Sequence, residues 1–156
     1  MIKSKLAKIA PICAIALVAV VSTGCANDPQ ASAEDLPLDP ISVSCDEFSA
    51  NHNISREVQL TAGSSVTIVL CSNPTTGFQW GQVQVEDPDV VAETDHEFVE
   101  PGNAENGESL MGAAGQDVWT FKALKKGSTN ISIDYSRPWE GGEKAEWTFN
   151  LTINVK

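Results

Sequence analysis

Few side chains in this 156-residue sequence are of the types that carry out catalysis or hold metals. It contains two histidines, four cysteines and 21 acidic residues. His52 lies in a polar segment without a nucleophile motif, and His96 lacks the second histidine of a zinc-protease helix. The acidic residues around His96 lack the spacing of a calcium-binding loop, so we interpret them as a solvated surface. We therefore predict no catalytic residue, no metal site and no cofactor, and a protein that is not an enzyme.

The N-terminal segment has the pattern of an export signal. Three lysines precede an apolar run over residues 9–21, which includes Cys13. That run is shorter than the roughly 20 residues that a membrane-spanning helix needs. A basic start, a short apolar run and small residues before a cleavage site are typical of a secretory signal peptide.

The next four residues determine how that signal is interpreted. Ser22-Thr23-Gly24-Cys25 resembles the lipobox of prokaryotic lipoproteins, with Ser22 where Leu is more common. The resemblance implies cleavage before Cys25 and acyl chains on Cys25, which hold a protein to a membrane surface without spanning it. A signal peptide that is cleaved without lipidation is the alternative. We expect an exported protein at the cell envelope, with its domain outside the cytoplasm.

The exported part divides into a tether and one domain. Residues 25–40 are small, polar and rich in proline, without an apolar period, which favours a semi-extended tether. Residues 41–156 are long enough to bury a core without a metal. The predicted organisation is a signal peptide over residues 1–24, a lipid-anchored tether over 25–40 and a folded domain over 41–156.

Cys45 and Cys71 are the two cysteines left in the domain. In an oxidising compartment a disulfide between them is the default expectation. By the loop-closure argument it would stabilise the fold by roughly 3 kcal/mol. Two free, buried thiols are the alternative.

The charge excludes nucleic acid as a class of partner. The chain has 10 basic and 21 acidic residues and a formal net charge of −11, whereas nucleic-acid binding needs a basic patch. Loss of residues 1–24, which hold three lysines and no acidic residue, would make the charge −14. We expect a domain that stays soluble beyond its anchor and is monomeric.

Hydrophobic periodicity predicts β-strands. Apolar side chains alternate with polar ones over residues 129–135 and 147–155, as on a strand with one buried face. Shorter candidates are residues 58–60, 66–70, 119–123 and 78–85, the last with a bulge near Gly81 and Gln82. No segment has a clear 3.6-residue period, and residues 86–115 read as a long irregular connection. We predict an all-β fold, an immunoglobulin-like β-sandwich of about seven strands with three binding loops at one end.

Trp80, Trp119 and Trp147 fall on predicted strands, so we assign them to the core. Residues 125–128 predict a tight turn between two of the strands.

The first binding loop is residues 73–78. Pro74 fixes one φ angle, Gly77 permits a positive φ, and Thr75 and Thr76 present hydroxyl and methyl groups at the tip. By itself this segment could be an ordinary turn.

Two further connections complete the predicted binding edge. The second loop, residues 110–115, joins exposed apolar side chains to backbone that can exchange hydrogen bonds with a partner. The third loop, residues 137–142, carries Arg137 and Trp139, residue types enriched at binding hot spots. Trp139 could instead simply cover the end of the sandwich. Since alternate connections of a sandwich gather at one end, we predict that the three loops form one protein-binding edge.

The three loops together resemble a known family. The segments are Asn73-Pro74-Thr75-Thr76-Gly77-Phe78, Gly112-Ala113-Ala114-Gly115 and Arg137-Pro138-Trp139. In sequence, order and spacing they are similar to the signature loops of chagasin-type inhibitors of papain-like cysteine proteases. The family pattern in the second loop is Gly-x-Gly-Gly, and Ala114 stands at its third place. A positive φ at that place would cost alanine roughly 1–2 kcal/mol.

The resemblance also implies a mechanism and a partner, a papain-like cysteine protease. Members of the family insert the three loops as a wedge into the protease cleft, reversibly and without covalent chemistry. The first loop would lie over the catalytic Cys-His pair, and the second loop would flank it on the substrate-subsite side. The third loop would flank it on the other side, with Trp139 on an aromatic surface of the enzyme and Arg137 bracing the loop.

Two other functions remain open from the sequence. An adhesion or assembly lipoprotein could use the same loop edge on a partner that is not a protease. An acidic metal-binding surface protein is the other alternative, and a melting temperature that rises with calcium would indicate it.

Overall fold

The computed structural model describes residues 38–102 and 112–156, which belong to one compact unit. The predicted signal peptide, Cys25 and most of the predicted tether lie outside these residues, as does the part of the second loop before Gly112. Among the described residues, no helix is long and apolar enough to cross a membrane.

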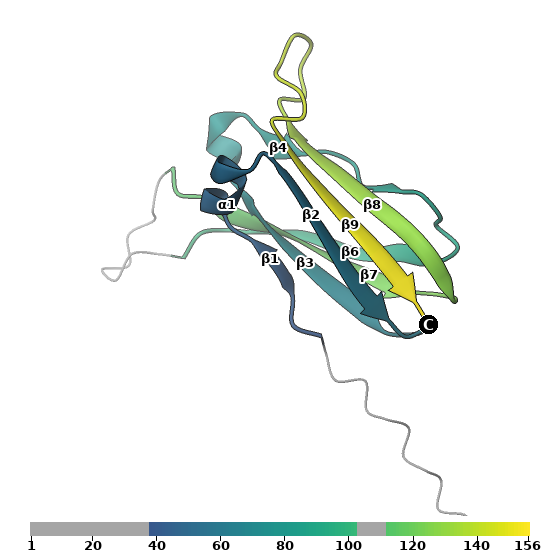
Figure 1. Cartoon of the computed structure of the whole chain (residues 1–156). Coiled ribbons are helices and arrows are strands. Elements are labelled where there is room, and N and C mark those ends of the chain that lie inside the picture. The colour runs from purple at the N-terminus through teal and green to yellow at the C-terminus, as the bar shows by residue number, and fades with distance from the viewer. Residues whose placement is uncertain (1–37, 103–111) are drawn as a thin grey trace, which may run out of the picture. The chain divides into compact units, whose positions relative to one another are not determined.

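Two β-sheets pack face to face around one hydrophobic core (Figure 1). The first sheet has the order β1 (Ile41–Val43), β3 (Ser65–Ser72), β7 (Gly115–Ala123) and β6 (Val91–Val99). The second has the order β2 (Asn53–Leu60), β9 (Trp147–Val155), β8 (Gly127–Ser136) and β4 (Gln79–Trp80), with β5 (Gln84–Val85) also on β8. The predicted all-β sandwich is confirmed. Its described part has nine strands rather than about seven, and β1, β4 and β5 are only two or three residues long.

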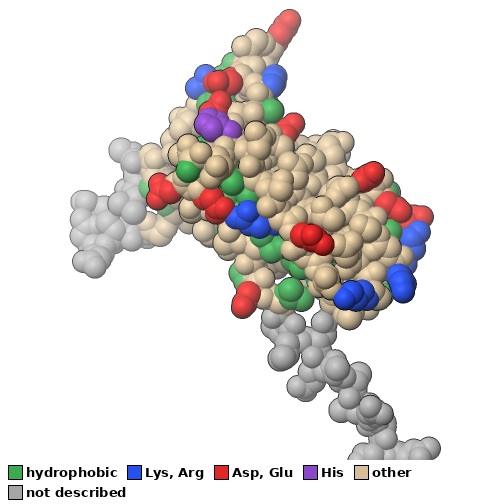
Figure 2. Space-filling model, viewed as in Figure 1, with side chains coloured by type: hydrophobic (Ala, Val, Ile, Leu, Met, Phe, Trp, Pro, Cys, Tyr) green, Lys and Arg blue, Asp and Glu red, His purple; other side chains and the backbone are tan. Residues whose placement is uncertain are grey.

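The long strands form where apolar and polar residues alternate in the sequence. In β8 and β9 the side chains at odd positions from Ile131 to Tyr135 and from Phe149 to Val155 are buried, and those between them are not. β7 repeats the pattern with Trp119 and Phe121 inside. In Figure 2 most of the face over β2, β9 and β8 is neither charged nor hydrophobic, as expected from the outward-facing Asn, Ser and Thr of these strands. The core is therefore built from one face of each sheet.

The expectation that residues 86–115 form an irregular connection is wrong. The strand β6 (Val91–Val99) runs through this stretch and pairs antiparallel with β7. From Glu93 to Val99 the side chains of this edge strand are exposed. In a strand that is solvated on both faces, apolar and polar residues do not alternate. The two-residue period that identifies a strand was therefore missing from the sequence.

One short α-helix accompanies the strands in the part of the chain that the structure describes. A six-residue helix, α1 (Cys45–Ala50), follows β1. Ser44 caps it, with its hydroxyl oxygen accepting a hydrogen bond from the Glu47 amide at 3.2 Å. Six residues make less than two helical turns, too few to show a 3.6-residue period. The helix contributes one fully buried side chain, Phe48.

The segment over residues 78–85 is interrupted where a bulge was expected. It forms β4 and β5, which both pair with β8, and Gly81 between them donates to Asp134 O at 2.8 Å. Trp80 on one side and Val83 and Val85 on the other all pack on the core. The expected turn connects β7 and β8, but it occupies residues 124–126, and Gly127 and Ser128 already belong to β8.

Candidate functional site

The first loop is a self-bracing turn at the end of β3. Residues Pro74–Thr76 form a short 3-10 helix, η1, which Asn73 caps. The Asn73 Oδ1 atom accepts from the Thr75 amide at 3.2 Å and from the Thr75 hydroxyl at 2.6 Å. The Thr76 hydroxyl donates to Asn73 O at 2.7 Å, and Gly77 ends the turn at φ 80°. The exposed tip is thus held in one shape by bonds within the loop.

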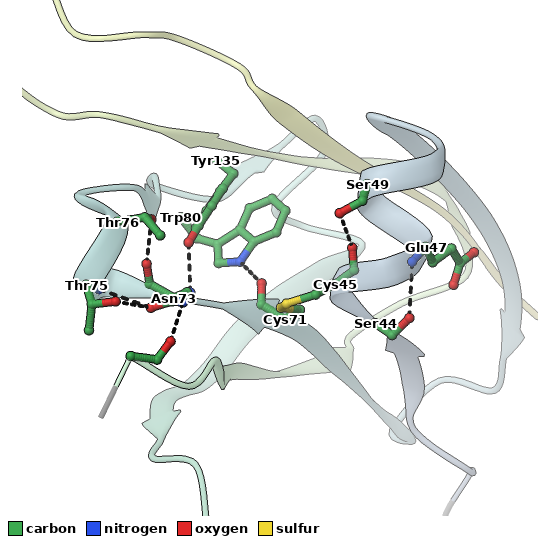
Figure 3. The surroundings of a disulfide bond; sticks show 11 residues. Ser44, Cys45, Glu47, Ser49, Cys71, Asn73, Thr75, Thr76, Trp80 and Tyr135 are labelled. Carbon is green, nitrogen blue, oxygen red and sulfur yellow. Dashed lines mark hydrogen bonds between the residues drawn. A yellow bond between two sulfur atoms is a disulfide. The ribbon is translucent and has the colours of Figure 1, made fainter. Parts of the chain in front are cut away.

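Asn73 also joins the first loop to the second. Its Nδ2 group donates to Gly112 O at 3.0 Å, across 39 residues of chain. Its backbone amide donates to the Tyr135 hydroxyl at 2.8 Å, which ties the start of the loop to β8. Figure 3 shows Asn73 with Thr75, Thr76 and Tyr135 around it. One side chain therefore shapes the first loop and fixes its place beside the second.

In the described part of the second loop only one residue needs the left-handed region. Gly112 has a φ of 80°, whereas Ala145 is the only non-glycine residue with a positive φ in residues 38–102 and 112–156. Ala114 is therefore accommodated without the backbone cost considered for it. Ala113 is half-buried and Ala114 is exposed. Gly115 begins β7, and a Cβ atom there would lie 2.7 Å from the Phe98 ring, so the close approach of β6 requires glycine.

The third loop lies on the first. A Cβ atom at Gly77 would lie 2.7 Å from Trp139 Cη2, which means that the indole covers the Gly77 backbone. Trp139 remains 51% exposed and is not part of the core cluster. It covers the first loop rather than the inner faces of the sandwich, and it presents about half of its surface to solvent.

Arg137 and Lys144 hold the third loop in place. The Arg137 guanidinium carbon lies 4.4 Å from the centre of the Phe78 ring and 5.9 Å from that of Trp139, which are cation–π distances. The Lys144 ammonium donates to Arg137 O and to Trp139 O. Gly142 N closes the turn by donating to Trp139 O at 3.1 Å. Pro138 stands between Arg137 and Trp139 and is exposed. Arg137 thus connects the third loop to the last residue of the first.

A column of aromatic rings supports this edge from below. Phe48 stacks on Trp147 at 5.0 Å, Trp147 on Tyr135 at 4.8 Å and Tyr135 on Phe78 at 5.5 Å. The Arg137 guanidinium lies over the Phe78 ring. The column runs from α1 through β9 and β8 to the first and third loops. Sequence reasoning missed it, because the four rings come from four separate elements.

The expected disulfide between Cys45 and Cys71 is present, with the Cα atoms 5.1 Å apart. It joins the first residue of α1 to β3, two residues before the first loop (Figure 3). Trp80 Nε1 donates to Cys71 O at 3.0 Å from inside the core. Trp80 and Trp119 are buried as expected, and Trp147 is partly buried against the core.

The histidines have structural surroundings. His52 Nδ1 lies 2.9 Å from Glu146 O, and His96 Nε2 lies 2.7 Å from Asp117 Oδ1 while its ring stacks on Trp119. In the part of the chain that the structure describes, no group of three or more His, Cys, Asp or Glu is placed to hold a metal ion.

Comparisons with known proteins agree with this fold. A family model described as Chagasin family peptidase inhibitor I42 matches residues 59–153. Chagasin of Trypanosoma cruzi is 28% identical over 99 residues, which are 62% of this chain and 86% of chagasin.

Two solved structures share the architecture. The cysteine protease inhibitor EhICP2 from Entamoeba histolytica has a TM-score of 0.54 and 22% identity, covering 74% of this chain and 95% of that chain. PbICP-C, solved in complex with falcipain-2, has a TM-score of 0.51 and 17% identity, covering 74% of this chain and 99% of that chain. The family match spans more than half of the sequence and includes all three loops. The chain therefore belongs to the chagasin family of peptidase inhibitors, whose members are inhibitors of proteases and not enzymes.

Proposed function

We propose that this protein is a reversible, non-covalent inhibitor of papain-like cysteine proteases and occludes the active-site cleft with its three loops. The observation that carries the proposal is the joining of the loops into one edge. Asn73 binds Gly112 of the second loop, and Trp139 of the third loop covers Gly77 of the first. Loops fixed in this way before binding lose little conformational entropy on docking.

Each loop has a role in the proposed wedge. The exposed tip over residues 74–76 would lie above the catalytic Cys-His pair and exclude the substrate. Residues 112–115 would flank it with backbone contacts on the substrate-subsite side. On the other side the exposed half of the Trp139 indole would pack on an aromatic surface of the protease. Arg137 has the bracing position in this scheme, because its guanidinium lies on Phe78 within the protein.

Two structural relatives support this partner class. EhICP2 is described as a cysteine protease inhibitor, and PbICP-C was solved with falcipain-2 bound. Because these two structures are less than 25% identical to this chain, they support only a shared fold. The proposal of a protease partner is based on the loop geometry and on the family of this chain.

The test is a titration of papain with a soluble form of residues 26–156. We expect inhibition that is competitive with a peptide substrate and is relieved on dilution. Inhibition that persists on dilution would contradict the non-covalent mechanism. No inhibition of papain or several other papain-like enzymes by a folded protein would reject the proposal, and adhesion or assembly would then become the leading function of this edge.

We also propose that the protein is exported and anchored to a membrane through acyl chains on Cys25. The basic start, the short apolar run and Ser22-Thr23-Gly24-Cys25 support this, and the disulfide fits an oxidising compartment. A tether over residues 25–40 would allow the domain to stand up to about 50 Å from the membrane when fully extended. Radiolabelled palmitate should be incorporated into the full chain but not into Cys25→Ala. Label retained in that variant would reject the anchor.

A further inference from the structure

The disulfide lies where β3 loses its neighbour on one side. β1 pairs in parallel with β3 from Ile41↔Ile68 to Val43↔Leu70 and then ends. On the other side, β3 continues to pair with β7 through Ser72↔Gly115. Cys71 and Ser72 therefore have no pairing partner in β1. At this position the Cys45–Cys71 disulfide connects β3 to the segment that follows β1.

The other end of the bond is firmly anchored. Cys45 is the first residue of α1, and Phe48 of the same helix is completely buried. Phe48 packs on Trp80 at 5.2 Å between ring centres and stacks on Trp147 at 5.0 Å. The disulfide thus connects a helix fixed in the core to the strand end that precedes the first loop (Figure 3).

Movement at this strand end would reach two loops. Asn73 is two residues after Cys71, and its side chain holds both the turn of the first loop and Gly112 of the second. Ser72 pairs with Gly115, where the second loop enters β7. The disulfide is therefore a restraint on the relative positions of the first and second loops, in addition to its contribution to stability.

We propose that the Cys45–Cys71 disulfide positions the first loop for binding, and that its reduction lowers the affinity for the protease. This inference rests on the proposed function and extends it to the regulation of the same edge. Other hydrogen bonds to the strand end remain after reduction, including those from Trp80 Nε1 to Cys71 O and from Asn73 N to the Tyr135 hydroxyl. The expected outcome is a folded domain with a loosened first loop.

The bond is accessible to a small reductant. Cys71 is 5% exposed, whereas Cys45 is half-buried. Both line an open hollow of about 430 Å³ beside the second loop. A dithiol attacks through its thiolate, most readily at Cys45 Sγ, to give a mixed disulfide, and its second thiol then displaces Cys45. Two electrons and two protons pass to Cys45 and Cys71, which become thiols, and the dithiol closes to its own disulfide.

Reducing conditions would have opposite effects on the activity of the protease and on the affinity of the inhibitor. The nucleophile of a papain-like protease is a thiolate, so reducing conditions keep the enzyme active. The same conditions would weaken the inhibitor. Inhibition would then be strongest outside the cell, under oxidising conditions, and weakest where thiols are plentiful.

The first experiment measures loop order in the inhibitor alone. Backbone ¹⁵N order parameters of Thr75, Thr76 and Gly77 are compared for oxidised protein, protein treated with dithiothreitol, and Cys45→Ser/Cys71→Ser. In the oxidised form we expect the rigid value of about 0.85, and in the other two a fall below about 0.6. Unchanged order parameters in protein shown to lack the disulfide would overturn the inference.

A matched variant separates positioning from stability. Leu60 is buried at the end of β2, where it pairs with Val155 near the C-terminus. Leu60→Ala destabilises the fold by removing core packing without touching the first loop. It should leave the order parameters of Thr75, Thr76 and Gly77 unchanged, and a fall equal to that of the cysteine variant would show a merely structural effect.

The second experiment measures binding by calorimetry to a papain-like protease whose catalytic cysteine is replaced by alanine. We expect binding at least about tenfold weaker for Cys45→Ser/Cys71→Ser, and within about twofold of wild type for Leu60→Ala. Equal affinities for wild type and the cysteine variant would overturn the link to inhibition. If the wild type bound no such protease, the proposed function would fail, while the order parameters would still decide whether the disulfide positions the loop.

Discussion

The Trp139 indole lies directly on the backbone of Gly77, so close that a methyl group at position 77 would overlap the ring. This contact joins two loops that are 62 residues apart in the sequence. Together with the hydrogen bond from Asn73 to Gly112, it makes one surface out of three connections. The predictions below follow from these two links and from the elements that support them.

Gly77→Ala should displace Trp139 and weaken inhibition. Alanine at a φ of 80° costs about 1 kcal/mol or more, and its Cβ atom would meet Trp139 Cη2 at 2.7 Å. Inhibition constants and thermal unfolding measure the two effects. Gly63→Ala is the matched control, because Gly63 has a φ of 95° and nothing lies within 4 Å of its Cβ position. The control should lose stability and keep its affinity, so an equal loss of affinity in both variants would contradict the role of the Trp139 contact.

Asn73→Asp should separate the two roles of Asn73. The carboxylate keeps an oxygen that can accept from Thr75, but it cannot donate to Gly112 O as the amide does. Because a charged oxygen would then face a carbonyl oxygen, we expect inhibition weaker by about 1–3 kcal/mol. Asn73→Ala removes both roles and should weaken it further. Wild-type inhibition constants in both variants would show that this bond does not contribute to binding.

Tyr135→Phe should lower stability by about 1 kcal/mol, the typical contribution of one hydrogen bond. The substitution removes the hydroxyl that accepts from Asn73 N and keeps the ring between Trp147 and Phe78. Urea unfolding, followed by tryptophan fluorescence, gives the change in free energy. A larger loss, with a changed near-ultraviolet circular dichroism spectrum, would mean that the aromatic column had been disrupted as well.

Replacing both cysteines of the disulfide by serine should lower the free energy of unfolding by roughly 3 kcal/mol, because 26 residues separate Cys45 from Cys71. Chemical unfolding of wild type and variant measures this difference. A thiol titration of unfolded wild type should find neither Cys45 nor Cys71 free. Two titratable thiols in a form without Cys25 would contradict the disulfide.

Sequence patterns predicted the parts of the fold in which one face of an element is buried. β8 and β9 alternate because their inner side chains enter the core and their outer ones meet water. β6 has few buried side chains and α1 has only six residues, so neither has a period that could be recognised. The strand interruption between Trp80 and Gln84 could be located, because the parity of the apolar residues changes there.

The sequence indicated which segments form the binding edge, but it did not indicate how the loops contact one another. Pro74, Gly77 and Trp139 are unusual enough in their segments to indicate a binding edge. The pairing of Asn73 with Gly112 and of Arg137 with Phe78 depends on how distant segments meet, and a local pattern does not contain that information. The backbone conformation of Ala114 could not be predicted either. Alanine is tolerated there because the positive φ angle falls on Gly112 and not on Ala114.

The inhibition constant for papain, measured for wild-type residues 26–156 beside Trp139→Ala, tests the central claim most directly. The exposed half of the indole is the hot-spot candidate of the third loop, so its removal should weaken binding by roughly 2–4 kcal/mol, or about 30- to 1,000-fold. Strong inhibition by the wild type and this loss in the variant are the predicted result. An unchanged inhibition constant would remove Trp139 from the binding edge and contradict the three-loop wedge.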